Sequence, residues 1–540
     1  MKKYLMLFFF ITQIGFSQEE DAWVYFTEKE NTAEAIANPL TILTQQAIDR
    51  KELHNVVIDE RDVPVTETYI SQLKNINGVT VLAKSKWFNC VFLRGELSII
   101  RDLQNLSFVS HIDYADNSLD TAVKFVKPTQ EKNESIYSKF GEKADFNYGS
   151  AAAQIQQLRA DYMHQQGYTG AGMIIAVMDA GFPGVDTNDG FKRARDEGRI
   201  LDGYNFVSRS DDEFAITGSS HGTQTFSDIA GYIDGEFIGT APDASYYLFV
   251  TEDVATEGPK EEALWVEAVE RADSLGVHVI NTSLGYSQQF DNPAYDYKTS
   301  DMDGQTTFIS RGANIAFDKG MLLVTSAGNS GGDSWGIITA PGDAPGTLTV
   351  GAIDQNGEYA GFSSIGPTAD NRIKPDVVAR GLGAAVLSSA NSVSSNSGTS
   401  FSSPIMAGAV TCLWQALPQL SNDEIIQVVR ASGSQYNTPT NQLGYGIPDF
   451  QSMLEDASLS VDTEDKVMMN VYPNPVQDQL FFTVPEGTTI QVTVFTIDGR
   501  MIQSEQLTDQ KYISLQDLAA GLYVVETISE NSRYIHKITK

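Results

Sequence analysis

Short apolar runs alternate with segments of helical periodicity between about residues 148 and 456. The apolar runs have the length of strands and cover residues 174–178, 246–250, 277–280, 321–325 and 347–352, and the clearest amphipathic segment is 261–275. Strands that alternate with helices form βαβ units, which build a parallel sheet with helices on both faces. We therefore expect an α/β domain over residues 148–456, with its active site beyond the carboxyl ends of the strands.

Three polar residues occupy positions in this pattern where catalytic chemistry could be placed. Asp179 follows the apolar run 174–178 and precedes a glycine-containing turn. His221 lies in the segment SSHGT (219–223), ahead of a helical stretch. Ser400 lies in SGTSFSSP (397–404), at the start of a buried helix whose first turn would hold a proline. Taken singly, each has an ordinary explanation, which is a loop carboxylate, a capping or surface histidine and an N-cap serine.

Taken together, the three residues meet the demands of nucleophilic catalysis. A serine hydroxyl is a weak nucleophile at neutral pH, so it needs a base within hydrogen-bond reach, and that base needs an orienting group. Asp179, His221 and Ser400 occur in the chain order of the subtilisins, which chymotrypsin-like enzymes and α/β-hydrolases do not share. On these motifs the chain resembles the subtilisin-like serine protease (subtilase) family over about residues 148–450. The resemblance implies a secreted serine endopeptidase that hydrolyses peptide bonds in proteins and peptides through an acyl-enzyme.

Two further segments extend the resemblance. The segment NTSLG (281–285) resembles the family's substrate-binding strand, and TSAGNS (325–330) resembles its oxyanion motif. The resemblance implies that Asn329 donates its side-chain amide to the tetrahedral oxyanion, together with the backbone N–H of Ser400. It also implies substrate-binding roles for Ser283, Leu284, Gly285, Ala327 and Gly328.

One position departs from the family pattern. Subtilases usually carry Ser or Thr directly after the catalytic Asp, and this chain has Ala180 there. The missing hydroxyl implies weaker hydrogen bonding around Asp179, but we still expect an active enzyme because the residues of direct chemistry are present. The other histidines fit the role of base less well, since His278 falls in an apolar run and His164 in a helix before the first core strand.

The N-terminal part of the chain contains two predicted segments. Residues 1–17 are typical of a secretory signal peptide, with two lysines, an apolar run and small residues before an acidic stretch. Residues 18–130 mix strand and helix patterns in the order of a split βαβ unit, which predicts a small α+β domain. This segment lies where secreted subtilases carry a propeptide that assists folding and inhibits the enzyme. A polar stretch at 127–145 is expected to be a linker.

The C-terminal segment 468–540 is predicted to be a small all-β domain after an acidic linker at 456–469. Its strand patterns include a hairpin turn signal at Asp498 and Gly499. The pieces VYPNP (471–475), IDGR (497–500) and LAAGLYVV (518–525) resemble the type A sorting domain read by the type IX secretion system. The resemblance implies the secretion machinery as a partner and a location outside the cell or on its surface. A general β-sandwich adhesion module is the alternative.

Charge and cysteine content exclude several other classes of protein. The net charge of −33 argues against nucleic-acid binding, because that affinity comes mainly from Lys and Arg that neutralise phosphates. Apart from the signal peptide, no stretch is long and apolar enough for a transmembrane anchor. Cys90 and Cys412 fall in different predicted domains, so we expect neither a disulfide between them nor a cysteine-rich metal site. The predicted chemistry requires no cofactor, and the structural calcium that many subtilases bind stays unassigned.

Two alternative functions stay open. The first is a catalytically inactive surface or adhesion protein on a protease scaffold. Degeneration would be expected first at Asp179, His221, Ser400 or Asn329, and all four are intact. The second is a processing protease with narrow specificity.

Overall fold

The computed structural model describes residues 19–120, 144–215 and 218–462, and within the tail residues 471–472, 476, 478–482, 489–496, 500–508, 512–516, 518–519, 521–528 and 533–540. The predicted signal peptide and most of the linker at 127–145 lie outside the described residues. The chain divides into two compact units, Met1–Leu454 and Glu455–Lys540.

A seven-stranded parallel sheet forms the centre of the first unit, in the order β13-β12-β11-β10-β5-β9-β6. The strands are β5 (Ile174–Asp179), β6 (Ile200–Asn205), β9 (Ser245–Val250), β10 (Val279–Thr282), β11 (Leu322–Ser326), β12 (Thr347–Ile353) and β13 (Val377–Arg380). Every residue of β5, β10, β11 and β12 is buried, as expected for strands covered on both faces. The α/β prediction for this region is confirmed.

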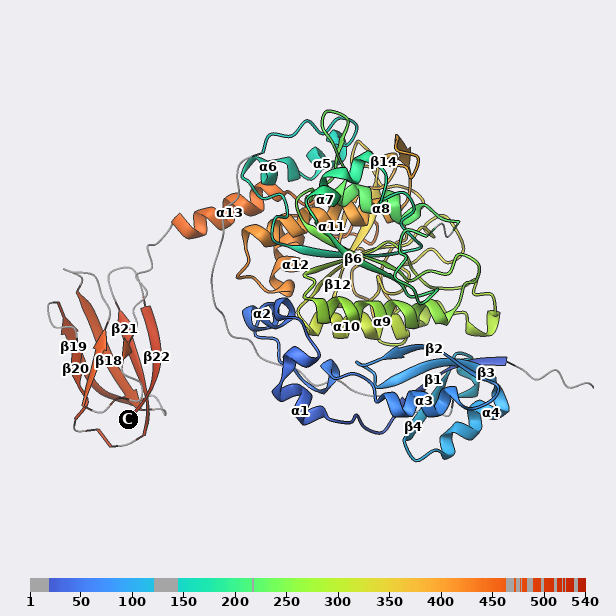
Figure 1. Ribbon diagram of the computed structural model, residues 1–540. Helices are drawn as coiled ribbons and strands as arrows, with labels where there is room; N and C mark the ends of the chain where they lie inside the picture. The colour runs from blue at the N-terminus through green and yellow to red at the C-terminus, as the bar shows by residue number, and fades with distance from the viewer. Residues whose placement is uncertain are drawn as a thin grey trace, which may run out of the picture. The chain divides into compact units, whose positions relative to one another are not determined.

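Helices cover both faces of this sheet (Figure 1). The helices α8 (His221–Ala230) and α11 (Thr399–Ala416) pack together on one face, and α9 (Pro259–Leu275) and α10 (Phe308–Asp318) lie on the other. The amphipathic segment predicted at 261–275 is α9, which has Pro259 at its first position and ends at Gly276 in the left-handed conformation, with φ 87°. Further helices of this region are α5 (Ala152–Gln157), α6 (Ala160–Gln165), α7 (Lys192–Asp196) and α12 (Asn422–Ala431).

The segment before the parallel sheet is a separate α+β layer. Its antiparallel sheet has the order β2-β3-β1-β4, with β1 (Glu19–Phe26), β2 (Val79–Ser85), β3 (Cys90–Glu96) and β4 (Val109–Tyr114). The helices α3 (Glu67–Lys74) and α4 (Leu97–Asp102) join a hydrophobic core with one face of this sheet. The predicted strand–helix–strand order is confirmed. The prediction did not include α1 (Thr32–Ala37) and α2 (Gln45–Leu53), which lie between β1 and α3.

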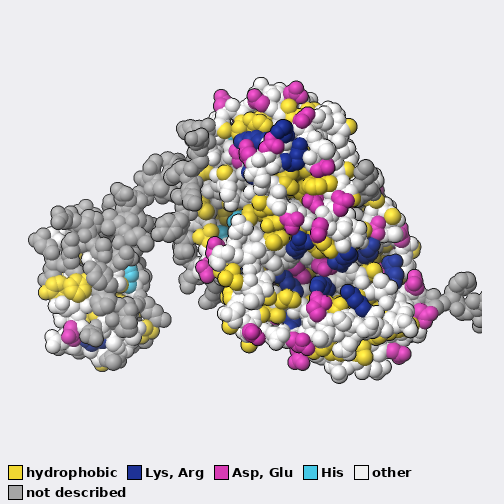
Figure 2. Space-filling view, viewed as in Figure 1, with side chains coloured by type: hydrophobic (Ala, Val, Ile, Leu, Met, Phe, Trp, Pro, Cys, Tyr) yellow, Lys and Arg dark blue, Asp and Glu magenta, His cyan; other side chains and the backbone are white. Residues whose placement is uncertain are grey.

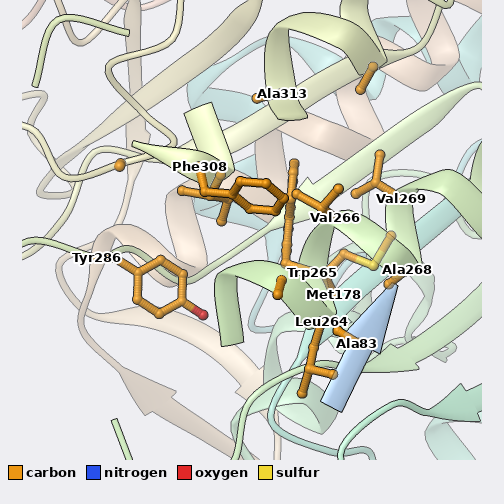
Figure 3. Packing of buried hydrophobic residues seen from close by; sticks show 14 of the residues in the cluster. Ala83, Met178, Leu264, Trp265, Val266, Ala268, Val269, Tyr286, Phe308 and Ala313 are labelled. Atoms are coloured by element: carbon orange, nitrogen blue, oxygen red, sulfur yellow. The ribbon is translucent and has the colours of Figure 1, made fainter. Parts of the chain in front are cut away.

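The other face of this small sheet packs on α9 and α10. The rings of Trp23 and Phe308 stack with their centroids 4.9 Å apart. Figure 3 shows Ala83 of β2 near Leu264 of α9, and both belong to a core that also contains Trp265. The small α+β layer and the parallel-sheet layer therefore share one hydrophobic interior.

A buried ionic cluster extends this interface at α2. Asp273 of α9 accepts hydrogen bonds from Arg50 (2.5 Å) and Lys51 (2.8 Å). Lys319, which follows α10, donates to Asp62 at 2.6 Å, and Lys51 lies 3.2 Å from the same carboxylate. These five side chains are at most 1% exposed. Burial alone would raise the pKa of Asp273, but the positive charges of Lys51, Arg50 and Lys86 outweigh it, so this pKa is lowered.

The second unit contains two antiparallel sheets, β16-β17-β20 and β19-β18-β21-β22. Their strands are β16 (Val471–Tyr472), β17 (Gln479–Phe482), β18 (Ile490–Thr496), β19 (Met501–Leu507), β20 (Tyr512–Ser514), β21 (Leu522–Ile528) and β22 (Arg533–Thr539). Leu480, Val494 and Val525 are among the residues of its own core. The all-β prediction is confirmed, and β18 pairs with β19 as the hairpin predicts, although the turn residues Asp498 and Gly499 lie outside the described residues.

Three smaller predictions can be compared with the structure. The segment expected as a linker from residue 456 is helical as far as Asp462, in α13 (Phe450–Asp462). Cys90 and Cys412 are both buried and free, as expected. Among the described residues, none of the helices combines the length and apolarity needed to cross a membrane.

On the face seen in Figure 2, Lys and Arg lie among Asp and Glu rather than in one continuous basic surface.

Candidate active site

The predicted site residues lie at the carboxyl edge of the parallel sheet. Asp179 is the last residue of β5, Ser283 follows β10, and Ala327 follows β11. His221 begins α8 and Ser400 is the second residue of α11, so each lies at a helix N-terminus. The parallel strands bring these ends to one side, where ligands of such sheets bind.

Asp179 and His221 form a direct hydrogen bond. His221 Nδ1 lies 2.8 Å from Asp179 Oδ1 and 3.0 Å from Oδ2. Burial would lower the pKa of His221, but the charges of Asp179 and Glu252 and the hydrogen bond to Asp179 outweigh it, so the pKa is raised above its ordinary value. Asp179 is 2% exposed, and its carboxylate also accepts from the backbone N–H of Ala180 at 2.7 Å. This pairing leaves Nε2 of His221 available to exchange a proton with a neighbour.

Gly222 lets α8 approach β5 closely. A Cβ atom placed on Gly222 would lie 2.4 Å from the Gly181 carbonyl oxygen and 2.9 Å from Asp179 Cβ. Contacts this short would push α8 away from β5. The glycine after the histidine is therefore required to bring His221 within reach of Asp179.

Ser400 is held at the start of a helix that is buried along nearly its whole length. Sixteen of the 18 residues of α11 are buried, and Ser400 itself is 8% exposed. Its Oγ lies 3.3 Å from the carbonyl oxygen of Ser283, and the ring of Phe401 lies 5.9 Å from the ring of His221. Backbone N–H groups in the first turn of a helix lack partners within that helix, so they can bind an oxyanion.

The hydroxyl of Ser283, directly after β10, replaces a backbone N–H that α11 lacks. Pro404 lies in the second turn of α11, not in the first turn as predicted, and it has no N–H to offer the Ser400 carbonyl four residues earlier. Ser283 Oγ donates to that carbonyl at 2.9 Å instead. Asn281 donates to Ser283 Oγ at 3.1 Å and accepts from Ser403 Oγ at 2.9 Å. These hydrogen bonds connect the sheet to the first two turns of α11.

The side-chain amide of Asn329 has a defined orientation. Its Oδ1 accepts from Thr399 N at 2.9 Å and from Thr399 Oγ1 at 3.0 Å. Because the oxygen is occupied by the residue next to Ser400, the two N–H donors of Nδ2 are left for another acceptor. Asn329 is exposed at this edge, as an oxyanion donor needs to be.

The remaining predicted binding residues differ in exposure. Gly285 is exposed and Leu284 is half-buried, whereas Ser283, Ala327 and Gly328 are buried. The Ser283 side chain is used within the protein, and Gly328 adopts φ 99° beside the Ser364 hydroxyl. His164 is buried and His278 is half-buried. Burial lowers the pKa of His278 to about 3 and that of His164 to about 4, so neither fits the role of base.

Two features of this edge were not predicted. Thr225 donates a hydrogen bond to Asp179 Oδ2 at 3.0 Å, and its spacing of four residues from His221 on one helix was the available signal. The second feature is a hollow of about 310 Å³ after β9, lined mainly by carboxylates. Glu252 in this hollow accepts from the hydroxyl of Tyr286 at 2.7 Å, and burial raises the pKa of Glu252 to about 8. Its lining residues are Glu252, Asp253, Val254, Ala255, Thr256, Glu257, Glu261 and Asp291.

The described part of the chain contains no group of three or more His, Cys, Asp or Glu arranged to hold a metal ion. The structural calcium that many subtilases bind stays unassigned.

A serine at a helix N-terminus and a carboxylate-bound histidine lie at the carboxyl edge of one parallel sheet, which are the residue types that a serine hydrolase uses. Residues 170–446, about half of the chain, match the subtilase family, and the chain belongs to that family as a serine endopeptidase. Residues 21–134 match the peptidase S8 propeptide domain of Bacteroidota, and residues 470–540 match the secretion system C-terminal sorting domain. The sorting domain indicates type IX secretion to the cell surface or the outside.

Curated relatives agree with this family. Subtilisin DY of Bacillus licheniformis is 28% identical over 273 residues, which are 50% of this chain and 87% of that protein. Serine protease AprX of Bacillus subtilis (strain 168) is 30% identical over 297 residues, and the alignment covers 49% of this chain and 62% of AprX. A crystal structure of MycP1 without its N-terminal propeptide aligns at a TM-score of 0.45 and 24% identity, covering 56% of this chain and 96% of MycP1.

Proposed function

We propose that this serine endopeptidase cleaves proteins and peptides through an acyl-enzyme formed on Ser400. The observation that carries the proposal is the Asp179–His221 hydrogen bond of 2.8 Å at the sheet edge where α11 presents Ser400. In the proposed reaction, His221 Nε2 accepts the proton of Ser400 Oγ as the oxygen attacks the scissile carbonyl carbon. Asp179 keeps Nδ1 protonated and balances the charge of the imidazolium.

The oxyanion and the leaving group are assigned to the same set of residues. The carbonyl oxygen becomes negative in the tetrahedral intermediate and accepts hydrogen bonds from Asn329 Nδ2 and the backbone N–H of Ser400. His221 then gives its proton to the leaving amine, and the C–N bond breaks. A water molecule attacks the acyl-enzyme with His221 as base and releases the acid product. Supporting this assignment, Oδ1 of Asn329 is already occupied by Thr399.

Covalent labelling tests the proposal directly. A fluorophosphonate should label the wild-type enzyme at Ser400, and Ser400→Ala should lose both the label and turnover. The expected loss in kcat is about 10⁶-fold, a magnitude measured on subtilisin, a member of this family. Full activity in Ser400→Ala would contradict the triad assignment. An unlabelled, inactive wild-type protein would favour the alternative, a surface or adhesion protein on a protease scaffold.

We further propose that the propeptide domain inhibits the enzyme until it is removed. The shared interior of β2, α9 and α10 supports a tight complex of the propeptide with the catalytic domain. Adding the isolated propeptide segment to the mature enzyme tests this proposal. Unchanged turnover at micromolar concentration would contradict an inhibitory role.

We also propose that export uses both ends of the chain. The predicted signal peptide would direct passage across the inner membrane, and the C-terminal domain would direct passage across the outer one.

A further inference from the structure

The Asp179 carboxylate needs more hydrogen bonds than His221 and Ala180 supply. The side chain is 2% exposed, so protein groups must satisfy both of its oxygens. Oδ1 receives the two shorter contacts, 2.7 Å from Ala180 N and 2.8 Å from His221 Nδ1. His221 Nδ1 carries a single hydrogen and lies farther from Oδ2, at 3.0 Å. Oδ2 therefore depends on another donor.

The hydroxyl of Thr225 is that donor. Thr225 Oγ1 lies 3.0 Å from Asp179 Oδ2, and Thr225 is fully buried. An ionised carboxylate only accepts hydrogen bonds, so the hydroxyl must donate. The Gly222 carbonyl, 3.1 Å from the same hydroxyl, competes for this hydrogen. The carboxylate is the stronger acceptor because it is charged.

The position of Thr225 on α8 gives this hydrogen bond a geometric consequence. His221 and Thr225 are four residues apart, so both side chains lie on the same face of the helix. The carboxylate of Asp179 is thus bound at Oδ1 and Oδ2 by two residues of one rigid helix. Rotation of the carboxylate away from the imidazole would break the bond to Thr225.

We propose that Thr225 is a positioning residue, whose hydroxyl fixes the Asp179 carboxylate so that the carboxylate orients His221. This inference rests on the proposed function, in which His221 is the base. Thr225 is fully buried and its hydroxyl binds Asp179, so it acts through Asp179 and not on the substrate. The hydrogen bond from Thr225 should therefore affect kcat, the rate of the chemical step, and not substrate binding.

The test removes the hydroxyl of Thr225 and keeps the shape of its side chain. Thr225→Val should lower kcat about tenfold to a hundredfold with KM unchanged, since the loss of one hydrogen bond to a charged group is expressed in the chemical step. Thr225→Ser should restore most of the loss, because it keeps the donor. Thr223→Val is the matched control, since Thr223 is equally buried on α8 but donates to the Pro183 carbonyl, at 2.8 Å. Rates are normalised to the active fraction titrated with fluorophosphonate, and Thr225→Ala replaces Thr225→Val if the valine variant does not fold.

Measuring the same substitution in an Asp179→Ala variant distinguishes a positioning role of Thr225 from a purely structural one. In Asp179→Ala, adding Thr225→Val should cause no further loss in kcat, because the group that it positions is gone. An undiminished further loss, or a kcat of Thr225→Val within about twofold of wild type, would overturn the inference. Ser400→Ala is measured alongside. Activity in that variant contradicts the proposed function itself, whereas an inactive Ser400→Ala with a normal Thr225→Val overturns only the role of Thr225.

Discussion

At the scale of single residues, the geometry of the candidate active site depends on neighbouring residues that orient its side chains. Asn329 has one defined orientation because Thr399, the neighbour of Ser400, occupies its oxygen. Gly222 permits the close approach that lets His221 meet Asp179. Thr399 and Gly222 hold no charge and transfer no proton, yet the geometry of the catalytic groups depends on both.

Removing the amide of Asn329 should weaken transition-state binding. We expect Asn329→Ala to lower kcat about 10²–10³-fold with little change in KM, a range known from subtilisin, because the oxyanion exists only after attack. Steady-state kinetics on a peptide substrate measure both constants. Thr399→Val is the companion variant. It removes one of the two donors to Asn329 Oδ1 and keeps the backbone N–H, so its loss should be smaller. A rise in KM at constant kcat would instead assign Asn329 to ground-state binding.

The acidic limb of the pH profile should lie above the ordinary histidine range. Only neutral imidazole accepts the proton of Ser400, so activity rises as His221 loses its own proton. Because the charge of Asp179 raises the pKa of His221, the limb of kcat/KM moves upward from about pH 6.5, not downward. A pH series from 5 to 9 measures its midpoint. Activity that does not change across this range would exclude histidine as the base.

The catalytic motifs were readable in the sequence because each lies in one contiguous segment. Asp179 ends β5, His221 begins α8, Ser400 is the second residue of α11 and Asn329 lies three residues after β11, so all four lie at or near the end of an element. Thr225 and the carboxylate hollow were not predicted. The role of Thr225 depends on contact with a strand 46 residues away in the chain. The hollow is lined by the segment 252–261 together with Asp291, and the sequence does not show how this segment folds.

At the scale of elements, α9 is the main contact of the propeptide layer with the catalytic layer. Glu270 of α9 accepts from Ser85 Oγ at 2.5 Å and from the backbone N–H groups of Lys86 and Trp87 at 2.8 and 2.9 Å. One turn further along, Asp273 binds Arg50 and Lys51 of α2. The helix therefore carries hydrophobic, backbone and ionic contacts to the propeptide along one face.

Breaking the ionic contact from the α9 side should loosen the propeptide. Asp273→Ala leaves Arg50 buried without its carboxylate and leaves Lys51 with Asp62 alone. Breaking a buried pair of this kind costs about 3–5 kcal/mol, or roughly 10²–10⁴-fold in affinity. Inhibition of the mature variant by added propeptide segment gives the affinity. Glu67→Ala is the control, because the Lys84–Glu67 pair is exposed and lies within the propeptide. Equal inhibition of Asp273→Ala and wild type would contradict the importance of this cluster.

The order of strands in the propeptide was predictable, whereas its extra helices were not. Strands β1 and β3 contain continuous apolar runs, at 22–26 and 90–93, and α3 and α4 have helical spacing. In α2, however, Arg50 and Lys51 appear in the sequence as surface charges, although both are buried against α9. Charged residues are seldom buried unless paired, and their partner Asp273 is more than 200 residues away.

At the scale of the whole molecule, the catalytic and sorting functions belong to separate units. The unit Glu455–Lys540 has its own β core, and the candidate catalytic residues all lie in the unit Met1–Leu454. The match to the secretion sorting domain covers 470–540 and the match to the subtilase family ends at 446. Catalysis and export are therefore expected to respond to different truncations.

Deleting residues 470–540 should stop export and spare catalysis. Expression of the truncated chain in its native host, followed by assays of periplasm and medium, should find active protease in the periplasm. The purified truncated enzyme should keep the kcat of the full chain, because its catalytic core is complete without the tail. Normal amounts in the medium would identify the tail as an adhesion or substrate-binding module. A loss of kcat in the purified truncated enzyme would show that the tail supports the catalytic fold.

The burial of α11 also determines the stage at which the chain can begin to cleave other proteins. Ser400 sits on a helix that has 16 of 18 residues buried and is bonded to β10 through Ser283 and Asn281. We expect a chain still emerging from the ribosome, or threaded unfolded through a membrane, to have an ordinary unreactive serine at this position. Proteolysis then begins only after the interior has closed, so neighbouring proteins are spared during synthesis and transport.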